Sequence, residues 1–474
     1  MKCLFCTSEA LPFAMSGGLG DVAGSLPYAL RQRLVGCRVV LPLYQGIPKE
    51  LRDTMRFVTD FSVPVAWRSQ YCGVFEAKYA GVIYYFIDNE YYFKRNNLYG
   101  YYDDAERFAF FSRAVIEMLP RIDFKPDIIH CNDWQTALVP VYYSLFYSNN
   151  NWYSGIKTVF TIHNIQYQGK YGLELLDEIV GIPNNYKSII EFDGCVNFMK
   201  GAIESAHRVT TVSNTYAHEI MDPWFSHGLD PILRAREWKV RGILNGIDTK
   251  NYNPETDKDI YKNYSSKSIE NKAENKMELQ KRLNLEVNKD IPMIGMVTRL
   301  VSHKGLDLVR EVLDRIMYET NVQFVILGSG DEQYEEFFRF MQEKYKGRLS
   351  ACHGFVPELS RKIYAGSDIF LMPSKSEPCG LSQMIALRYG AIPIVRETGG
   401  LKDSVHDSGD GEGNGFTFRN YDAYDMLNAV HRAVGGYQEK DGWKILVKRA
   451  MESDNSWSKS ADEYINLYRE LVNQ

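Results

Sequence analysis

The chain has 474 residues, of which 45% are hydrophobic and 24% are charged, and 55 cations against 60 anions give a net charge of −5. This length exceeds one ordinary hydrophobic core and predicts two domains. The charge balance gives no support for binding nucleic acid or an anionic membrane through bulk electrostatics. Aromatic residues make up 13% of the chain, and their ring faces can stack on sugars.

The N-terminus leads directly into a strand pattern, without a basic and apolar leader segment before it. No stretch of about 18 apolar residues predicts a membrane span. The eight cysteines are scattered, and Cys3 and Cys6 form a Cys-x-x-Cys pair with no second pair after it. Buried free thiols are therefore expected rather than a metal or redox site, in a reduced, cytoplasmic protein.

Short apolar strands alternate with amphipathic helices, a pattern typical of parallel sheets with crossover helices. In the first half the pattern predicts strands at Lys2–Cys6, Arg38–Tyr44, Tyr84–Ile87, Asp127–Cys131, Thr158–Ile162, Arg208–Ser213 and Val240–Leu244, and helices at Asp104–Leu119 and Gln135–Tyr147. In the second half it predicts strands at Ile291–Val297, Gln323–Leu327, Arg348–His353, Asp368–Met372 and Ile392–Val395, and helices at Gly305–Tyr318, Gln333–Tyr345 and Leu381–Tyr389.

The two halves meet near Asn245–Asp248, where we place a hinge. The predicted domains are residues 1–245 and 246–455, and the second begins with a solvated, polar connector, Asp257–Asp290, that holds one helix near Glu270–Leu283. Residues 456–474 contain an amphipathic helix with a possible capping box from Ser460 to Glu463. We expect this helix to cross back to the first domain. The predicted fold class is α/β, with two doubly wound, Rossmann-like domains facing a central cleft.

A polar loop from Pro373 to Gln383 separates an apolar strand from the next helix and carries Glu377. Arg299 and Lys304 flank another strand-to-helix turn in the same half. Ligands of open parallel sheets bind where strand ends and helix N-termini converge. One carboxylate and two cations at this edge indicate transfer chemistry, with the cations offsetting charge on a leaving diphosphate.

Two glycine pairs stand at strand-to-helix turns. Gly17 and Gly18 follow the first strand, and Gly399 and Gly400 follow the strand at Ile392–Val395. Bare backbone allows close approach of a ligand, and helix N-termini present free N–H groups. The two loops could grip opposite ends of one ligand. The spacing differs from Gly-x-Gly-x-x-Gly, which argues against a nicotinamide cofactor.

Polar residues also end two strands of the first half. His163 and Asn164 follow one strand, and a histidine there can contact a sugar hydroxyl or only close the loop. Asp133 follows the other and is equally suited to cap a helix. No His/Cys cluster has metal-ligand spacing and no nucleophile elbow is present, so no metal and no cofactor are expected.

The chain resembles the bacterial glycogen synthase and plant starch synthase family along nearly its whole length. The matching stretches are Gly17–Val22, Asp133–Gln135, Thr161–Asn164, Asn245–Asp248, Lys272–Lys276, Arg299–Leu300 with Lys304–Asp307, Leu327–Asp331, Glu377–Leu381 and Thr398–Leu401. The resemblance implies the GT-B fold and a retaining, metal-independent glucosyltransferase. It implies transfer of glucose from ADP-glucose to the non-reducing 4-hydroxyl of an α-1,4-glucan (glycogen).

The resemblance also implies residue roles. Arg299 and Lys304 would hold the donor phosphates, Glu377 would lie beside the glucose ring, and His163 would contact the sugar and support the transition state. Further donor contacts would come from Gly17, Gly18, Asp21, Asn245, Lys276, Gly328, Gly330, Phe355, Cys379, Gly380 and Leu381. Contacts on the acceptor and sugar side would come from Asp133, Asn164 and Tyr92.

Two positions bear on the assignment. Met15 stands where the family usually has a donor-contacting lysine, which leaves donor affinity and donor choice open. Ile385 stands where many related transferases place a second carboxylate, and the starch synthase branch generally lacks that carboxylate too. The alternatives are a transferase that uses UDP-glucose or forms another glucoside, and a catalytically silent relative that binds glucan.

Overall fold

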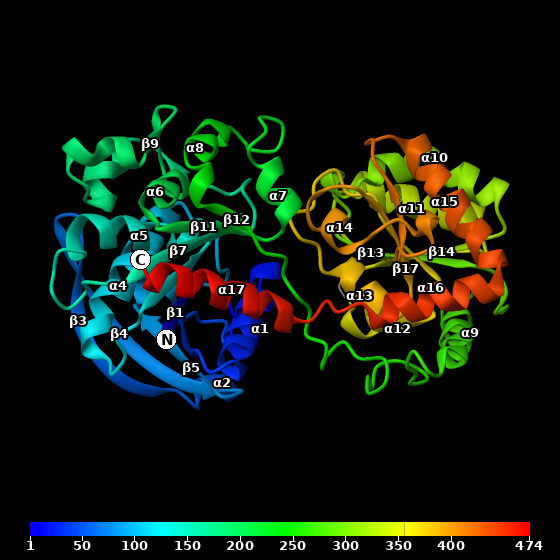
Figure 1. Ribbon diagram of the computed structural model, residues 1–474, viewed down its shortest axis with the longest axis horizontal. Coiled ribbons are helices and arrows are strands. Elements are labelled where there is room, and N and C mark those ends of the chain that lie inside the picture. Colours follow the sequence, from blue (N-terminus) through cyan, green and yellow to red (C-terminus); the bar gives the residue numbers. More distant parts are fainter. Residues whose placement is uncertain (355) are drawn as a thin grey trace. The chain divides into compact units, whose positions relative to one another are not determined.

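The computed structural model describes residues 1–354 and 356–474. Phe355, expected to lie against adenine, is outside the described residues. The chain forms two compact units, shown in Figure 1. The N-terminal unit comprises Met1–Asn245 and Trp457–Gln474, and the C-terminal unit comprises Gly246–Ser456.

The N-terminal unit is built on a nine-stranded sheet in the order β12-β11-β7-β6-β1-β2-β5-β4-β3. The strands from β12 to β5 are parallel, and β4 and β3 add an antiparallel hairpin at one edge. Its strands are β1 (Lys2–Cys6), β2 (Gly36–Pro42), β3 (Arg56–Val65), β4 (Arg68–Tyr79), β5 (Val82–Asp88), β6 (Ile128–Asn132), β7 (Lys157–Ile162), β11 (Arg208–Thr211) and β12 (Val240–Gly242). A separate three-stranded sheet consists of β8 (Lys170–Tyr171), β10 (Cys195–Asn197) and β9 (Glu191–Phe192).

The helices of this unit are α1 (Gly18–Gln32), α2 (Lys49–Arg52), α3 (Glu90–Phe93), α4 (Asp104–Met118), α5 (Leu138–Tyr142), α6 (Phe198–Ser205), α7 (Asn214–Glu219), α8 (Asp230–Ala235) and α17 (Trp457–Val472). The single helix predicted at Gln135–Tyr147 is instead a 3-10 turn (Trp134–Thr136), the short α5 and a π turn (Tyr143–Tyr147). Pro140 lacks the N–H that would bond the carbonyl of Thr136, so an α-helical start upstream is disfavoured.

Helix α17 packs against α1 in the N-terminal unit, and Figure 1 shows it as the red helix beside the blue one. Its Tyr468 hydroxyl bonds the buried His130 ring of β6 at 2.6 Å. The predicted capping box is wrong: the helix begins at Trp457, and Ser460 lies inside it and donates to the carbonyl of Leu244.

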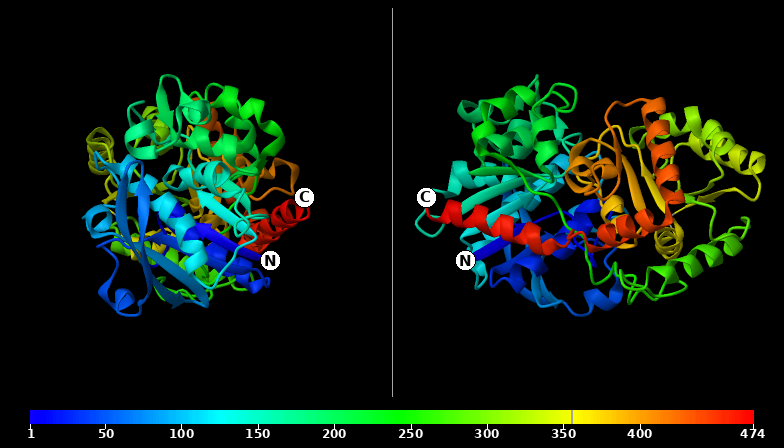
Figure 2. Two further views of the ribbon diagram at one scale, coloured as in Figure 1. Left: turned by 90° about the vertical axis from the view of Figure 1, so that its left-hand side faces the viewer. Right: turned by 45° about the vertical axis from the view of Figure 1, so that its right-hand side comes forward.

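The C-terminal unit is built on a six-stranded, fully parallel sheet in the order β15-β14-β13-β16-β17-β18. Its strands are β13 (Met293–Val297), β14 (Gln323–Gly328), β15 (Leu349–His353), β16 (Ile369–Met372), β17 (Ile392–Arg396) and β18 (Phe416–Phe418). Its helices are α9 (Lys272–Arg282), α10 (Leu306–Glu319), α11 (Glu332–Lys344), α12 (Pro357–Gly366), α13 (Ser382–Arg388), α14 (Gly399–Ser404), α15 (Ala423–Gln438) and α16 (Lys440–Glu452). They cover both faces of the sheet, as the right-hand view of Figure 2 shows.

The connector expected to be solvated is partly a core element. Leu279 of α9 is fully buried with Leu285 and Met293, and α9 packs against α12. The composition of α9 misled the prediction because its buried polar side chains bond backbone groups. Asn275, for example, accepts from the N–H groups of Tyr261 and Lys262. No helix among the described residues is long and apolar enough to cross a membrane.

Candidate active site

The carboxyl edge of the C-terminal sheet brings Lys304 and Glu377 together. Their loops follow the neighbouring strands β13 and β16, and the Lys304 ammonium lies 2.7 Å from Glu377 Oε2. Ser374 also donates to Oε2, at 3.0 Å. Glu377 is only 8% exposed, yet its other oxygen, Oε1, accepts no hydrogen bond from a described residue. That oxygen is available to a ligand's hydroxyl.

Arg299 lies in the same loop as Lys304 and is exposed. Its guanidinium forms no ion pair within the described part of the chain. Between the two cations, His303 has a pKa below its usual range because it is partly buried and lies near Lys304 and Arg299. The loop therefore holds two cations on either side of a histidine with a lowered pKa, and one of these cations has no ion-pair partner among the described residues. Such an arrangement suits an anionic ligand.

Two glycines at and just after the end of β14, Gly328 and Gly330, pack closely against the Arg299 loop. A Cβ on Gly328 would clash with the carbonyl oxygen of Thr298, and one on Gly330 would clash with that of Leu300. The Leu300 N–H donates to the Ser329 carbonyl at 2.9 Å. Direct contact of these glycines with the nucleoside stays a prediction, but their close packing on the neighbouring loop is enough to explain why they are glycines.

The second glycine pair holds the Glu377 loop in the same way. The Gly400 N–H lies 3.2 Å from the Glu377 carbonyl, and a Cβ on Gly399 would clash with that oxygen. This packing is enough to explain why both residues are glycines, and contact of the pair with a ligand stays a prediction. Cys379, Gly380 and Leu381 complete the loop before α13, and Gly380 needs its positive φ of 72°.

On the N-terminal unit, His163 follows β7 and lies beside the end of β6. Its Nε2 is 2.9 Å from Asn132 Oδ1, and the Asn132 amide group in turn donates to the Cys6 carbonyl at 2.9 Å. This chain of bonds assigns the proton to Nε2 and leaves a lone pair on Nδ1. Burial lowers the pKa of His163 to about 3, so the ring is neutral near pH 7 and presents Nδ1 as an acceptor.

Asp133 bonds the loop that carries His163 and Asn164. Its Oδ1 accepts from the His163 N–H at 2.8 Å and from the Asn164 N–H at 3.4 Å. The backbone of Asp133 has a φ of 56° and a ψ of 178°, a strained conformation for a residue with a side chain. Burial raises the pKa of Asp133 to about 7. Strain and a shifted pKa at a strand end are typical of functional sites.

The glycine loop after β1 leads into α1. Gly17 and Gly18 are exposed, and Asp21 lies in the first turn of the helix. The Ser16 and Gly17 N–H groups bond Glu9 Oε2, at 2.6 and 3.1 Å. Met15, in place of the family lysine, is 45% exposed and brings no charge to the loop.

Two of the residues predicted to contact substrate, Lys276 and Tyr92, are buried by contacts within the protein. Lys276 is buried near the amino ends of β13 and β16, where its ammonium bonds Asp368 at 2.6 Å and Tyr437 at 3.0 Å. Asp368 also accepts from the Met293 N–H at the start of β13. This is the edge opposite Glu377, so we withdraw Lys276 as a donor contact.

Tyr92 is the second of these buried residues. It is fully buried, packs on Phe110 and donates to Glu106 at 2.6 Å. The structure gives it a core role, and we withdraw it as a sugar contact. Asn245 fits its prediction better: it is buried, and its Oδ1 has no hydrogen-bond partner among the described residues. Buried polar atoms usually have partners, so this oxygen can serve a ligand.

A hollow of about 440 Å³ lies next to the Asp133 and His163 loops. It is lined by Trp134, Gln166, Tyr167, Gln168, Gly169, Lys170, Tyr171 and His227. Tyr167 is 56% exposed, and its N–H bonds the Asn164 carbonyl. Aromatic faces beside amide groups suit a sugar chain.

The sequence reasoning missed three residues that orient the candidates: Glu9, Asn132 and Ser374. Asn132 and Ser374 stand at or just after strand ends, a signal that could have identified them. Glu9 lies three residues past β1, on the segment that leads to the glycine loop, and could have been noted for that position. Within the described part of the chain, no group of three or more His, Cys, Asp or Glu side chains could hold a metal ion.

Two families match the chain. Residues 2–235 match the starch synthase catalytic domain, and residues 278–443 match the glycosyl transferases group 1. Glycogen synthase of Clostridium beijerinckii is 53% identical over 481 residues, covering 100% of both chains. Glycogen synthase of Clostridium perfringens is 52% identical, covering 100% of this chain and 98% of its own length.

Solved structures agree. The catalytic domain of starch synthase IV from Arabidopsis thaliana, bound to ADP and acarbose, matches with a TM-score of 0.90 and 36% identity, over 100% of this chain and 99% of that one. Sucrose-phosphate synthase from Thermosynechococcus elongatus matches with a TM-score of 0.61 and 16% identity, over 100% of this chain and 99% of its own, which shows a shared fold alone. The chain matches glycogen synthases over its full length, and its first half matches the catalytic domain of starch synthases. This chain therefore belongs to the glycogen synthase family.

Proposed function

We propose that this chain extends an α-1,4-glucan by transferring glucose from ADP-glucose to the non-reducing end, with retention of the anomeric configuration. The observation that carries the proposal is the Lys304–Glu377 ion pair of 2.7 Å beside the unpaired Arg299. It combines a fixed positive field for a leaving diphosphate with a carboxylate for the sugar. Full-length similarity to glycogen synthases supports the same reaction.

On the donor side, Arg299 and Lys304 bind the diphosphate and offset the charge that grows on it as the bond to glucose breaks. The Lys304 ammonium has three donors, so it can keep its bond to Glu377 and still bind a phosphate oxygen. Glu377 Oε1 accepts from a glucose hydroxyl, and the nearby negative charge stabilises the positive sugar in the transition state. Asn245 and the backbone of Cys379–Leu381 add polar contacts.

On the sugar and acceptor side, neutral His163 accepts a hydrogen bond from a glucose hydroxyl at Nδ1. Asp133 holds the backbone of that loop, and Asn164 lies at its end. The aromatic hollow receives glucan residues beyond the reacting one. The acceptor's 4-oxygen attacks on the face that the diphosphate leaves: the bond from C1 to phosphate breaks, the new glycosidic bond forms, and the hydroxyl proton passes to a departing phosphate oxygen.

Glucose transfer is tested by incubating the protein with maltoheptaose and either ADP-glucose or UDP-glucose. We expect ADP release and longer chains that an α-1,4-specific exoglucosidase removes. Faster extension with UDP-glucose would overturn the donor assignment. Binding of maltoheptaose without release of either nucleotide would instead establish a silent, glucan-binding relative.

A further inference from the structure

Gly17 and Gly18 differ from the glycines that pack against the Arg299 and Glu377 loops of the C-terminal unit. A Cβ on Gly328, Gly330 or Gly399 would clash with neighbouring backbone, whereas a Cβ on Gly17 or Gly18 would meet no described atom within 4 Å. Internal packing therefore does not require bare backbone at these two positions. A bound molecule that approaches the start of α1 does require it.

The Glu9 carboxylate accepts hydrogen bonds from the residues that precede α1, Ser16 and Gly17. Its Oε2 accepts from the N–H groups of Ser16, at 2.6 Å, and Gly17, at 3.1 Å. Its Oε1 accepts from the hydroxyls of Ser16, at 2.7 Å, and Tyr99, at 2.8 Å. Four donors thus converge on one carboxylate, and two of them are backbone groups directly before the helix.

Glu9 is only 4% exposed, and no lysine or arginine of the described chain pairs with it. Buried carboxylates normally have a cationic partner or several hydrogen bonds, because burial of a charge is unfavourable. Among the described residues, the hydrogen-bond partners of the Glu9 carboxylate are Ser16, Gly17 and Tyr99. The negative charge also reaches the Asp133 carboxyl, where it contributes to the raised pKa.

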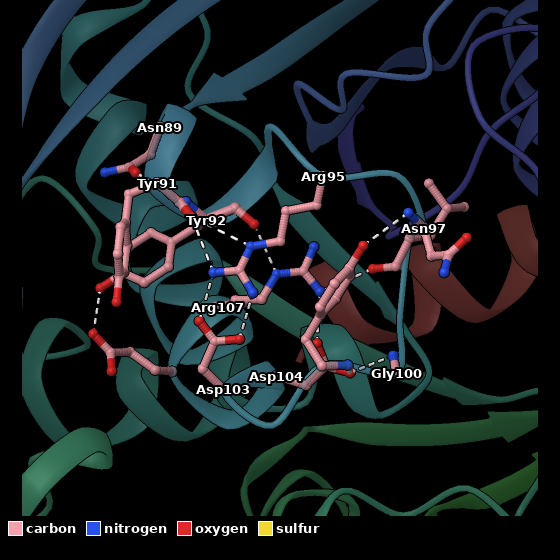
Figure 3. A network of polar contacts seen from close by, with 12 residues as sticks. Asn89, Tyr91, Tyr92, Arg95, Asn97, Gly100, Asp103, Asp104 and Arg107 are labelled. Atoms are coloured by element: carbon pink, nitrogen blue, oxygen red, sulfur yellow. Dashed lines mark hydrogen bonds and ion pairs between the residues drawn. The ribbon is translucent and has the colours of Figure 1, made fainter.

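Tyr99 is itself fixed by a polar network, shown in Figure 3. Arg95 forms two bonds of 2.6 Å with Asp103, which close the segment between them. The fully buried Arg107 donates to the Leu98 carbonyl at 3.0 Å and pairs with Asp104 at 2.6 Å. The network fixes the backbone on either side of Tyr99. The Tyr99 hydroxyl is therefore held in position to donate to Glu9.

We propose that Glu9, braced by Tyr99, is a positioning residue for donor binding. Its carboxylate fixes the backbone of Ser16 and Gly17, so that the N–H groups of Gly18 and Leu19 face the oxygens of bound ADP-glucose. These two N–H groups begin α1 and have no partner inside the helix. This inference rests on the proposed function, since it assumes that the donor occupies the glycine loop.

Four variants test it, with kcat, the KM for ADP-glucose, the Kd for ADP and the Tm measured for each. Glu9→Ala removes all four bonds and should raise the KM by roughly tenfold. Glu9→Gln should stay within about threefold of wild type, because its oxygen can serve the two N–H groups while its amide donates to the two hydroxyls. Tyr99→Phe removes the brace, together with the bond between the Tyr99 and Ser8 hydroxyls, and should raise the KM about threefold.

Asp127→Ala is the matched control. Asp127 accepts from the Lys2 N–H at 2.7 Å, at the opposite end of β1, so its loss should lower the Tm and leave the KM unchanged. An unchanged KM in Glu9→Ala, or equal damage in Glu9→Gln and Glu9→Ala, overturns the positioning role. If Glu9→Ala does not fold, an unchanged KM in Tyr99→Phe overturns it.

The two proposals fail in different ways. A wild type that transfers no glucose refutes the proposed function, and the Kd for ADP in the same variants then decides the role of Glu9. If the wild type is active and Glu9→Ala has an unchanged KM for ADP-glucose, only the positioning role is refuted.

Discussion

At the scale of single residues, the two cations of the site differ in their partners. Lys304 pairs with Glu377, whereas Arg299 is exposed and unpaired within the described chain. The same loop therefore contains one cation without an ion-pair partner among the described residues and one that neutralises a nearly buried carboxylate. Substitution of either cation should lower activity to a similar extent, but only substitution of Lys304 should also lower stability.

Arg299→Met and Lys304→Met should each lower kcat by roughly 100- to 1,000-fold, because each removes a fixed charge from the leaving diphosphate. Only Lys304→Met leaves Glu377 without its cation, and it should lower the free energy of unfolding by about 1–3 kcal/mol. Steady-state kinetics and urea titration of both variants check this. Full activity in either variant would remove that residue from the mechanism.

Asp133 should make stability depend on pH. Burial raises its pKa from 3.8 to about 7, so the folded state favours the protonated carboxyl. That contribution is fully present below about pH 4 and is lost as the pH rises through 7. The unfolding free energy of the wild type should therefore fall relative to that of Asp133→Asn between pH 5 and 8. Urea titrations of both proteins across this range measure it. A constant difference in unfolding free energy between the two proteins would contradict the prediction.

Met15 stands where the resemblance to the family implies a lysine. Met15→Lys adds a cation beside the glycine loop, and we expect a several-fold lower KM for ADP-glucose because the donor carries a diphosphate. Met15→Gln controls for the loss of the apolar side chain. A KM that responds equally to both substitutions would exclude a charge effect.

At the scale of elements, α17 is attached to the N-terminal unit by both apolar and polar contacts. Tyr464 and Tyr468 are buried, and the Tyr468 hydroxyl meets the His130 ring, whose pKa burial lowers to about 3. Arg241 and Glu470 add an ion pair of 3.0 Å at the surface. The helix therefore contributes to the folding of a unit from which it is distant in sequence.

Tyr468→Phe should lower the free energy of unfolding by about 1–3 kcal/mol, because it leaves the His130 nitrogen buried without its partner. Tyr318→Phe, at a position 88% exposed, is the control and should change it by less than about 0.5 kcal/mol. Chemical denaturation of the two variants gives the comparison. Equal values would show that the His130–Tyr468 bond adds nothing to stability.

At the scale of the whole molecule, the chain passes between the units twice, after Asn245 and after Ser456. The two passages are joined, since the Ile247 N–H donates to the Asn455 carbonyl at 2.8 Å. Two short, paired segments are suited to act as a hinge, because few backbone angles must change.

We therefore expect ADP with maltoheptaose to close the two units and exclude water, which would otherwise compete as acceptor. Small-angle scattering should show a smaller radius of gyration with both ligands than without. Superimposable profiles would contradict hinge closure. Maltoheptaose alone serves as the control, because it lacks the nucleotide.

The sequence by itself determined the family, the two parallel-sheet α/β units and the strand-end loops that carry Arg299, Lys304, Glu377 and His163. These follow from local signals: alternating strands and helices, and polar residues at strand ends, which topology gathers at the carboxyl edge of each sheet. The family and the fold class are confirmed by the comparisons. The individual site roles stay predictions.

Only the tertiary structure decided which partners these residues have. The sequence did not distinguish a glycine that faces open space, such as Gly17, from one packed on a neighbouring loop, such as Gly399. Nor did it show that Lys276 lies at the opposite edge or that Glu9 holds the glycine loop. Partner choice depends on contacts between residues far apart in the chain, and those distances exist only once the sheets are assembled.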